Sequence, residues 1–99
     1  MPRRIKLPKP SEEMSRAFVM MAEEVGGWPG VSTRLMFGMR AMYRDGVVFG
    51  MIPDKRSFKV ADAIAHKVGG KWVAFEVKGE EGIREALMVL EKAYEAVRK

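Results

Sequence analysis

The dipeptide Asp45-Gly46 constrains the fold most, because it lies between two segments that alternate in the manner of β-strands. A two-residue hairpin turn of type I′ needs positive φ at both of its residues, and Asp followed by Gly is a favoured pair for it. The sequence therefore predicts a β-hairpin centred on Asp45-Gly46, within a strand-forming segment of residues 31–60. At 99 residues without a cysteine, the chain is expected to fold as one domain that no disulfide stabilises.

Two amphipathic helices are expected at the two ends of this domain. Ser11 is a favourable N-cap for the first helix, which carries one apolar stripe and ends at Gly26-Gly27. The last helix is expected from about residue 80 to residue 99, also with one apolar face. The stripes consist of Met14, Ala17, Phe18, Met21 and Val25 in the first helix, and of Ile83, Leu87, Leu90, Tyr94 and Val97 in the last.

The segment between the hairpin and the last helix is expected to add a short helix and a strand. Apolar residues recur at helical spacing in 61–68 and predict a short helix that ends at Gly69-Gly70, whereas residues 71–77 alternate like a strand. The resulting order is helix, β-meander, short helix, strand and helix. It indicates an α+β domain over residues 11–99, in which an antiparallel sheet carries the N- and C-terminal helices on one face.

Residues 1–10 are basic and proline-rich, and we expect them to form a flexible tail outside the domain. No apolar stretch follows the basic start, so a secretory signal is not expected and the expected location is cytoplasmic. No apolar stretch approaches the ~20 residues of a membrane span. The net charge of +5 comes largely from this tail and from residues 34–78. The tail has two open interpretations, a solvated leader or an arm that contacts phosphate.

Strand alternation divides the hairpin residues between two faces of the sheet. One face has no formal charge, and its small residues Ala41 and Gly50 leave room for a helix, so we expect this face to form the core. The other face is then expected to be a contact surface, unless a terminal helix covers it. The candidate interface residues on this second face are Arg40, Met42, Arg44, Phe49 and Met51.

Catalytic chemistry is not expected from this sequence. His66 is the only histidine, there is no cysteine, and His66 is expected near the end of the short helix without a nucleophile or a second metal ligand beside it. We therefore expect no catalytic residue, no metal site, no cofactor and no enzymatic activity. Trp72 has two open interpretations: it anchors the contact surface, or it caps the core beneath a helix, which is the favoured one.

The middle of the chain contains an R-x-M-F-G element, an aromatic residue five positions later, a D-G turn and an aromatic-Lys pair. The residues of this pattern are Arg34, Met36, Phe37, Gly38, Tyr43, Asp45, Gly46, Phe49, Phe58 and Lys59. Over residues 33–60 the pattern resembles the TfoX N-terminal domain family. Most of the motif also has a structural explanation, since Gly38 suits a tight bend and Phe37, Tyr43 and Phe49 suit a core.

The resemblance implies an α+β fold similar to that of secretion chaperones, and a link to the regulation of natural competence. It further implies a non-catalytic regulatory domain that acts through protein contacts, as a homodimer or with a protein partner. The alternative is a nucleic-acid-binding accessory protein that uses the basic tail and the basic middle segment, where aromatic residues lie among the cations.

Overall fold

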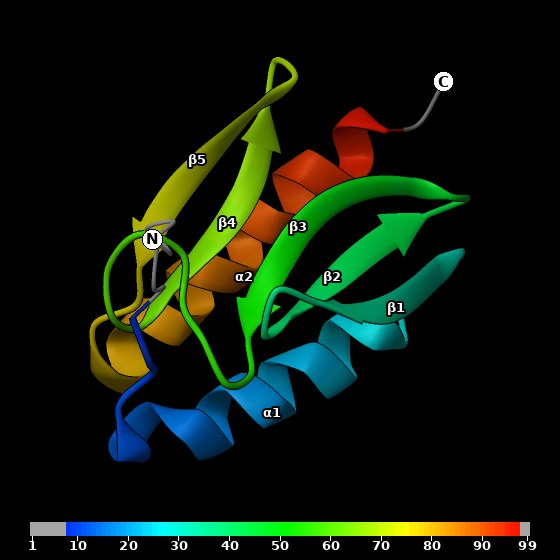
Figure 1. The fold of residues 1–99 in the computed structure, drawn as a ribbon. Coiled ribbons are helices and arrows are strands. Elements are labelled where there is room, and N and C mark those ends of the chain that lie inside the picture. Colours follow the sequence, from blue (N-terminus) through cyan, green and yellow to red (C-terminus); the bar gives the residue numbers. More distant parts are fainter. Residues whose placement is uncertain (1–7, 98–99) are drawn as a thin grey trace, which may run out of the picture.

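The computed structural model describes residues 8–97, which form one antiparallel sheet with a helix at each end of the chain (Figure 1). The strands follow one another in the sheet in chain order, β1-β2-β3-β4-β5. This arrangement confirms the expected α+β fold. The elements are α1 (Glu12–Gly26), β1 (Val31–Met36), β2 (Met39–Arg44), β3 (Val47–Pro53), β4 (Ala63–Val68), β5 (Lys71–Glu76) and α2 (Gly79–Ala96).

Residues 1–7 of the expected tail lie outside the described residues. Pro8 lies within them, and its carbonyl oxygen accepts a hydrogen bond of 2.7 Å from the backbone N–H of Ser57. Helix α1 begins as expected, because the hydroxyl of Ser11 accepts a hydrogen bond from the backbone N–H of Met14. The backbone N–H of Ser11 in turn donates to a carboxylate oxygen of Asp62 at 2.7 Å, which ties the start of α1 to the loop before β4.

Both helices pack on the same face of the sheet, and Figure 1 views the sheet from the opposite side, with α2 behind β3 and β4. The close approach of α2 depends on Gly50, because a Cβ atom at this position would lie only 2.5 Å from Cδ2 of Leu90. The fully or nearly fully buried members of this core are Met14, Phe18, Met21, Ala22, Val25, Met42, Phe49, Ile52, Ile64, Val77, Ala86, Leu90, Ala93 and Tyr94.

The prediction of a short helix over residues 61–68 is wrong, since Ala63–Val68 is strand β4. This strand pairs with β5 over its whole length, and Gly69 and Gly70 form the connecting turn, both at positive φ. Ile64 packs under the helices and its neighbour Ala65 lies on the opposite face of the sheet. A segment this short fits helical and strand spacing almost equally well, so pairing with the neighbouring strands decided the outcome.

A β-bulge in β3 changes the predicted hairpin register. The turn at Asp45-Gly46 forms as expected, with φ of 51° and 85°, and Arg44 pairs with Val47. Beyond it, Tyr43 pairs with Val48 but Met42 pairs with Gly50, so Phe49 is the extra residue. Both Phe49 and Gly50 therefore face the helices, and the residues after them face the side opposite to the one that alternation predicts.

None of the helices formed by residues 8–97 is long and apolar enough to cross a membrane.

Candidate functional site

The sequence placed the contact surface on the face that the helices cover, and this assignment is wrong. Met42 and Phe49 are fully buried beneath α1 and α2. Arg40 and Arg44 project from β2 toward the same side as Met42, because they alternate with it along the strand. Met51 belongs to the other face, since it lies beyond the bulge and packs with Met39 and Ala41. The five candidate residues therefore do not form one surface.

Arg44 has a structural role in the core instead. Its Nη1 donates a hydrogen bond of 2.9 Å to the carbonyl oxygen of Tyr94, and its guanidinium carbon lies 4.0 Å from the centre of the Tyr94 ring. No basic residue lies in the last turn of α2, so Arg44 supplies the positive charge that a helix C-terminus favours. Tyr94 also donates from its hydroxyl to the carbonyl oxygen of Pro29 at 2.6 Å and makes edge contacts with Trp28 and Phe49.

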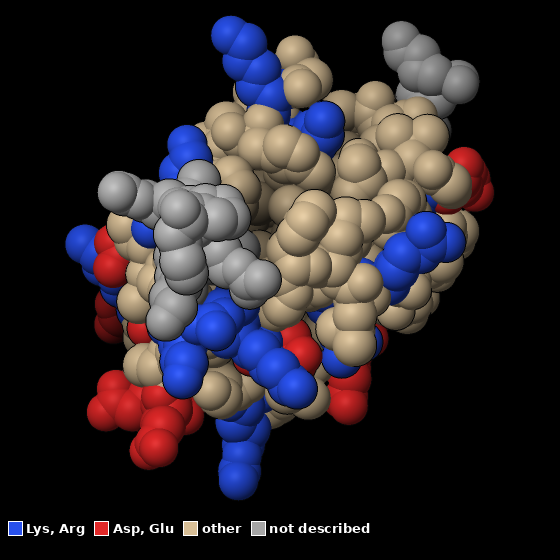
Figure 2. All heavy atoms as spheres, in the orientation of Figure 1, with Lys and Arg blue, Asp and Glu red and all other residues tan. Residues whose placement is uncertain are grey.

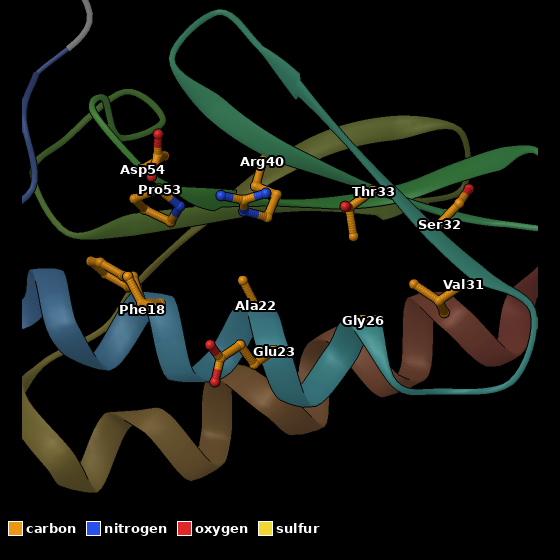
Figure 3. A pocket seen from close by; sticks show the side chains of 11 residues that line it. Phe18, Ala22, Glu23, Gly26, Val31, Ser32, Thr33, Arg40, Pro53 and Asp54 are labelled. Carbon is orange, nitrogen blue, oxygen red and sulfur yellow. The ribbon is translucent and has the colours of Figure 1, made fainter.

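Arg40 lies in a hollow of about 440 Å³ between the sheet and α1 (Figure 3). Phe18, Ala22 and Glu23 line it from α1, and Asp54 lines it from the end of β3. Two carboxylates, those of Glu23 and Asp54, and the guanidinium of Arg40 share this hollow, so its lining has no net positive charge to attract an anionic ligand.

The face of the sheet away from the helices is not covered by a helix or a strand among residues 8–97, and we call it the open face. At its centre Met39, Ala41, Met51 and Ala65 are buried by the larger side chains around them. These surrounding side chains are half-buried, so each presents part of its surface to solvent. They are Met36, Tyr43, Val48, Phe58 and Trp72.

Trp72 lies on this open face, so the favoured expectation that it caps the core beneath a helix is wrong. Its ring centre is 6.5 Å from that of Phe58, in a tilted arrangement. Phe58 comes from the loop between β3 and β4, whereas Trp72 comes from β5. The alternative expectation, that Trp72 belongs to an uncovered surface, agrees with its position.

Each aromatic ring of the open face has a cationic side chain against it. The guanidinium carbon of Arg34 is 5.7 Å from the ring centre of Tyr43, and Nζ of Lys67 is 4.8 Å from that of Trp72. Nζ of Lys59 is 5.5 Å from the ring centre of Phe58. Cations at these distances are attracted to the electron-rich faces of the rings. The open face thus combines three flat apolar groups with three positive charges.

The charges of the domain are divided between its two layers. Helix α1 holds four acidic residues and one basic residue, and α2 holds five acidic and two basic, which gives the helices a net charge of −6. Residues 27–78, which contain the sheet and its loops, hold nine basic and four acidic residues, for a net charge of +5. Figure 2 shows a broad area of the open face without charged residues, with Lys and Arg at several places along its margin and Asp or Glu at others.

The loop between β3 and β4 is held in place by Ser57, which the sequence analysis did not single out. Ser57 is fully buried, and its hydroxyl accepts a hydrogen bond of 3.1 Å from the backbone N–H of Asp62. The loop carries Phe58 and Lys59 to the edge of the open face, with Lys59 at a positive φ of 69°. A serine in an irregular segment gives no sequence signal for such a role, because its partner is decided by the loop conformation.

The motif residues of 33–60 fall into two groups in space. Phe37 and Gly38 form the turn between β1 and β2, and Asp45 and Gly46 form the next turn, all at positive φ. The expectation that Phe37 is a core residue is wrong, since it is 75% exposed. The other motif side chains, apart from the buried Phe49, lie on the open face or at its edge. They are Arg34, Met36, Tyr43, Phe58 and Lys59.

His66 lies in β4, opposite Gly50 on one side and Val73 on the other, rather than near a helix C-terminus. Partial burial lowers the pKa of its imidazole, because burial disfavours the charged form. Within residues 8–97, no group of three or more His, Cys, Asp or Glu side chains is arranged to hold a metal ion.

Comparisons with protein-family models, with curated proteins and with solved structures found no match to this chain.

Proposed function

We propose that this protein is a non-catalytic binding domain, and that the open face of its sheet is the surface through which it acts. One observation carries the proposal: both helices pack on one side, and the uncovered side carries three aromatic rings, each with a cation against it. Large apolar rings that stay partly exposed on one continuous surface are typical of a contact site, whereas the rings of a hydrophobic core are fully buried.

The likeness of residues 33–60 to the TfoX N-terminal domain supports the regulatory part of this proposal. Turn geometry accounts for Phe37, Gly38, Asp45 and Gly46, because all four adopt positive φ. It does not account for Arg34, Met36, Tyr43, Phe58 and Lys59, whose side chains gather at the open face. A regulatory role linked to competence is the function that the resemblance implies for such a surface.

Self-association as a homodimer remains a prediction, although the five residues expected to mediate it do not form one surface. Met42 and Phe49 are inaccessible in the folded domain. A dimer of this protein would therefore have to use the open face, a sheet edge or the outer surface of the helices. Light scattering of the wild-type protein at low and moderate salt measures its mass directly.

The two tryptophans provide an internal test of which surface binds. Trp72 lies on the open face, whereas Trp28 packs against Tyr94 on the helix side. In the Trp28→Phe variant the fluorescence reports from the open face, and in the Trp72→Phe variant it reports from the helix side.

Each variant is titrated with unlabelled protein that carries both Trp→Phe changes and, separately, with a single-stranded oligonucleotide. We expect the emission of Trp72 to change with at least one of these partners, and that of Trp28 to stay constant. A response from Trp28 with none from Trp72 would contradict the proposal, because it would place the contact surface on the other side of the sheet.

A further inference from the structure

The partner of the open face can be inferred from its charge and from the chemistry of its rings, if the open face is the contact surface as proposed above. We propose that the open face binds single-stranded nucleic acid, with bases stacked on Tyr43 and Trp72 and with phosphates paired to the neighbouring cations. The bound strand crosses the sheet from β1 and β2 to β4 and β5.

The division of charge favours a negatively charged partner at this face. The sheet and its loops carry a net charge of +5 and the helices −6. Arg40, Arg44 and Lys71 project toward the helix side, and without them six basic residues remain against four acidic ones. One of the acids, Glu76, alternates onto the same side of β5 as Trp72. Another, Asp62, is already bonded to the backbone of Ser11. A polyanion is attracted to the open face and repelled by the helix layer.

The same charges disfavour a second copy of this chain. Two open faces brought together would place Arg34, Lys67 and Lys59 of each copy near the same cations of the other. The apolar centre of the face adds little to offset that repulsion, since Met39, Ala41 and Ala65 are already almost fully buried within one chain. Only the half-buried rim would lose solvent contact, so the gain from burying apolar area is small.

The aromatic-cation pairs match the repeating chemistry of a nucleotide chain. Every base has a flat π-face that stacks on an aromatic side chain, and every nucleotide carries one phosphate charge. Arg34 lies against Tyr43, and Lys67 lies against Trp72. When a base stacks on the ring in place of the cation, the cation moves to the adjacent phosphate. The full negative charge of the phosphate attracts the cation more strongly than the quadrupole of the ring does.

The spacing of the two pairs suits a short extended strand. Tyr43 is in β2 and Trp72 is in β5, three strand spacings away in the sheet, which corresponds to about 14 Å. Met51 in β3 and Ala65 in β4 lie between them and provide an uncharged floor. The open face has no helix among residues 8–97 that could enter a DNA major groove, and stacking on its rings needs unpaired bases. These features favour single strands over duplexes.

The test measures fluorescence anisotropy of a labelled oligothymidylate of about ten nucleotides, within the usual site size of a small stacking domain. An oligouridylate of the same length distinguishes DNA from RNA as the source of the strand. If Arg34, Lys59 and Lys67 each neutralise one phosphate, the logarithm of the association constant falls with the logarithm of the salt concentration with a slope of about −2. Affinity then falls roughly 15- to 20-fold between about 50 and 200 mM salt.

Matched variants separate the open face from the rest of the domain. Trp72→Ala is expected to weaken binding roughly 5- to 150-fold, the range for removal of one stacking ring. Its control is Val73→Ala, the next residue of β5, which points to the other face and should leave binding unchanged. Lys67→Gln should make the salt slope shallower by about 0.7, whereas Lys92→Gln in the acidic helix α2 should not alter it.

Circular dichroism of each variant establishes that it is folded, and Lys67→Gln keeps the test valid if Trp72→Ala does not fold. The proposal is overturned if no single strand binds, if a duplex of the same length binds more tightly, or if Val73→Ala weakens binding as much as Trp72→Ala. It also fails if Trp72 emission responds to protein concentration and not to the oligonucleotide, a result that leaves the open face as a contact surface for a second copy. If Trp72 responds to neither, the proposed function fails as well.

Discussion

The two faces of the sheet use the same kinds of side chain in opposite ways. On the helix side, Arg44 and Tyr94 bond to backbone carbonyl oxygens and stack on one another at 4.0 Å. On the open face, the guanidinium carbon of Arg34 lies 5.7 Å from the ring centre of Tyr43, and no helix or strand among residues 8–97 covers the pair. The first pair is fixed by hydrogen bonds and burial, whereas no hydrogen bond joins the second pair to the described backbone in the same way. An arginine beside a tyrosine therefore stabilises the helix side, and on the open face the same pairing is available to the partner that we propose.

This contrast predicts very different effects for adjacent residues of β2. Met42→Asp places a carboxylate among fully buried apolar side chains and should cost more than about 4 kcal/mol, enough to unfold the domain. Tyr43→Asp changes the open face and should cost about 1 kcal/mol. Urea unfolding followed by circular dichroism compares the two. Equal losses would mean that the open face is as much a core as the helix side.

Gly50→Ala tests how closely the helix side is packed. The added methyl group would lie 2.5 Å from Cδ2 of Leu90 and 3.3 Å from the carbonyl oxygen of Ala65. Because Leu90 is fully buried, it has little room to move, and we expect a loss of about 1–3 kcal/mol. Gly82→Ala is the control, since its methyl group would meet Val77 no closer than 3.4 Å. A stable Gly50→Ala variant would show that α2 can shift away from β3.

The two tyrosines sharpen the comparison at the level of one hydroxyl group. Tyr94→Phe removes the hydrogen bond to the carbonyl oxygen of Pro29 and should cost about 1–2 kcal/mol. Tyr43→Phe should leave the stability within about 0.5 kcal/mol, because this ring lies at a partly exposed surface. It should also keep nucleic-acid binding, since the ring rather than the hydroxyl stacks. Thermal unfolding midpoints of the two variants, measured side by side, compare the two losses of stability.

The smallest expected effect is a pH dependence from His66. Burial lowers the pKa of this histidine below its ordinary value of 6.5, so the unfolded chain binds the proton more tightly than the folded domain. The stability that the neutral imidazole of His66 contributes is complete above pH 6.5. It decreases as the pH falls from there through the lower pKa that His66 has in the folded domain. The unfolding midpoint should therefore decrease slightly between pH 7.5 and pH 5.5. The His66→Gln variant should lack this part of the change.

Several local features followed from the sequence because neighbouring residues determine them. Ser11 caps α1 and Asp45-Gly46 turns the chain as expected, and four of the five residues of the stripe from Met14 to Val25 are buried. The tight bend expected at Gly38 is also present as a turn with Phe37, although that ring is exposed and not buried. The backbone preferences of these residues predict where the helix begins and where the turns lie. They do not predict which other side chains each residue contacts.

The candidate contact residues failed for two physical reasons, a bulge in β3 and a wrong choice of face. Alternation along β3 assumes one residue per position, and the extra residue Phe49 breaks this assumption. With the bulge, Phe49 and Gly50 both face the helices and Met51 moves to the open face. The wrong choice of face followed from Arg40 and Arg44, whose charges argued for solvent. Arg44 instead bonds to the end of α2, which a strand pattern cannot reveal.

The sequence by itself determined the α+β class, the two terminal helices, the hairpin turn at Asp45-Gly46 and the excess of cations in the middle segment, because each depends on local preference or composition. Only the tertiary structure decided which face the helices cover and which aromatic rings stay accessible. Those outcomes depend on a bulge at Phe49 and on contacts such as that between Arg44 and Tyr94, which join residues fifty positions apart. The charge separation between the helices and the sheet became visible only once the fold had assigned each segment to its layer.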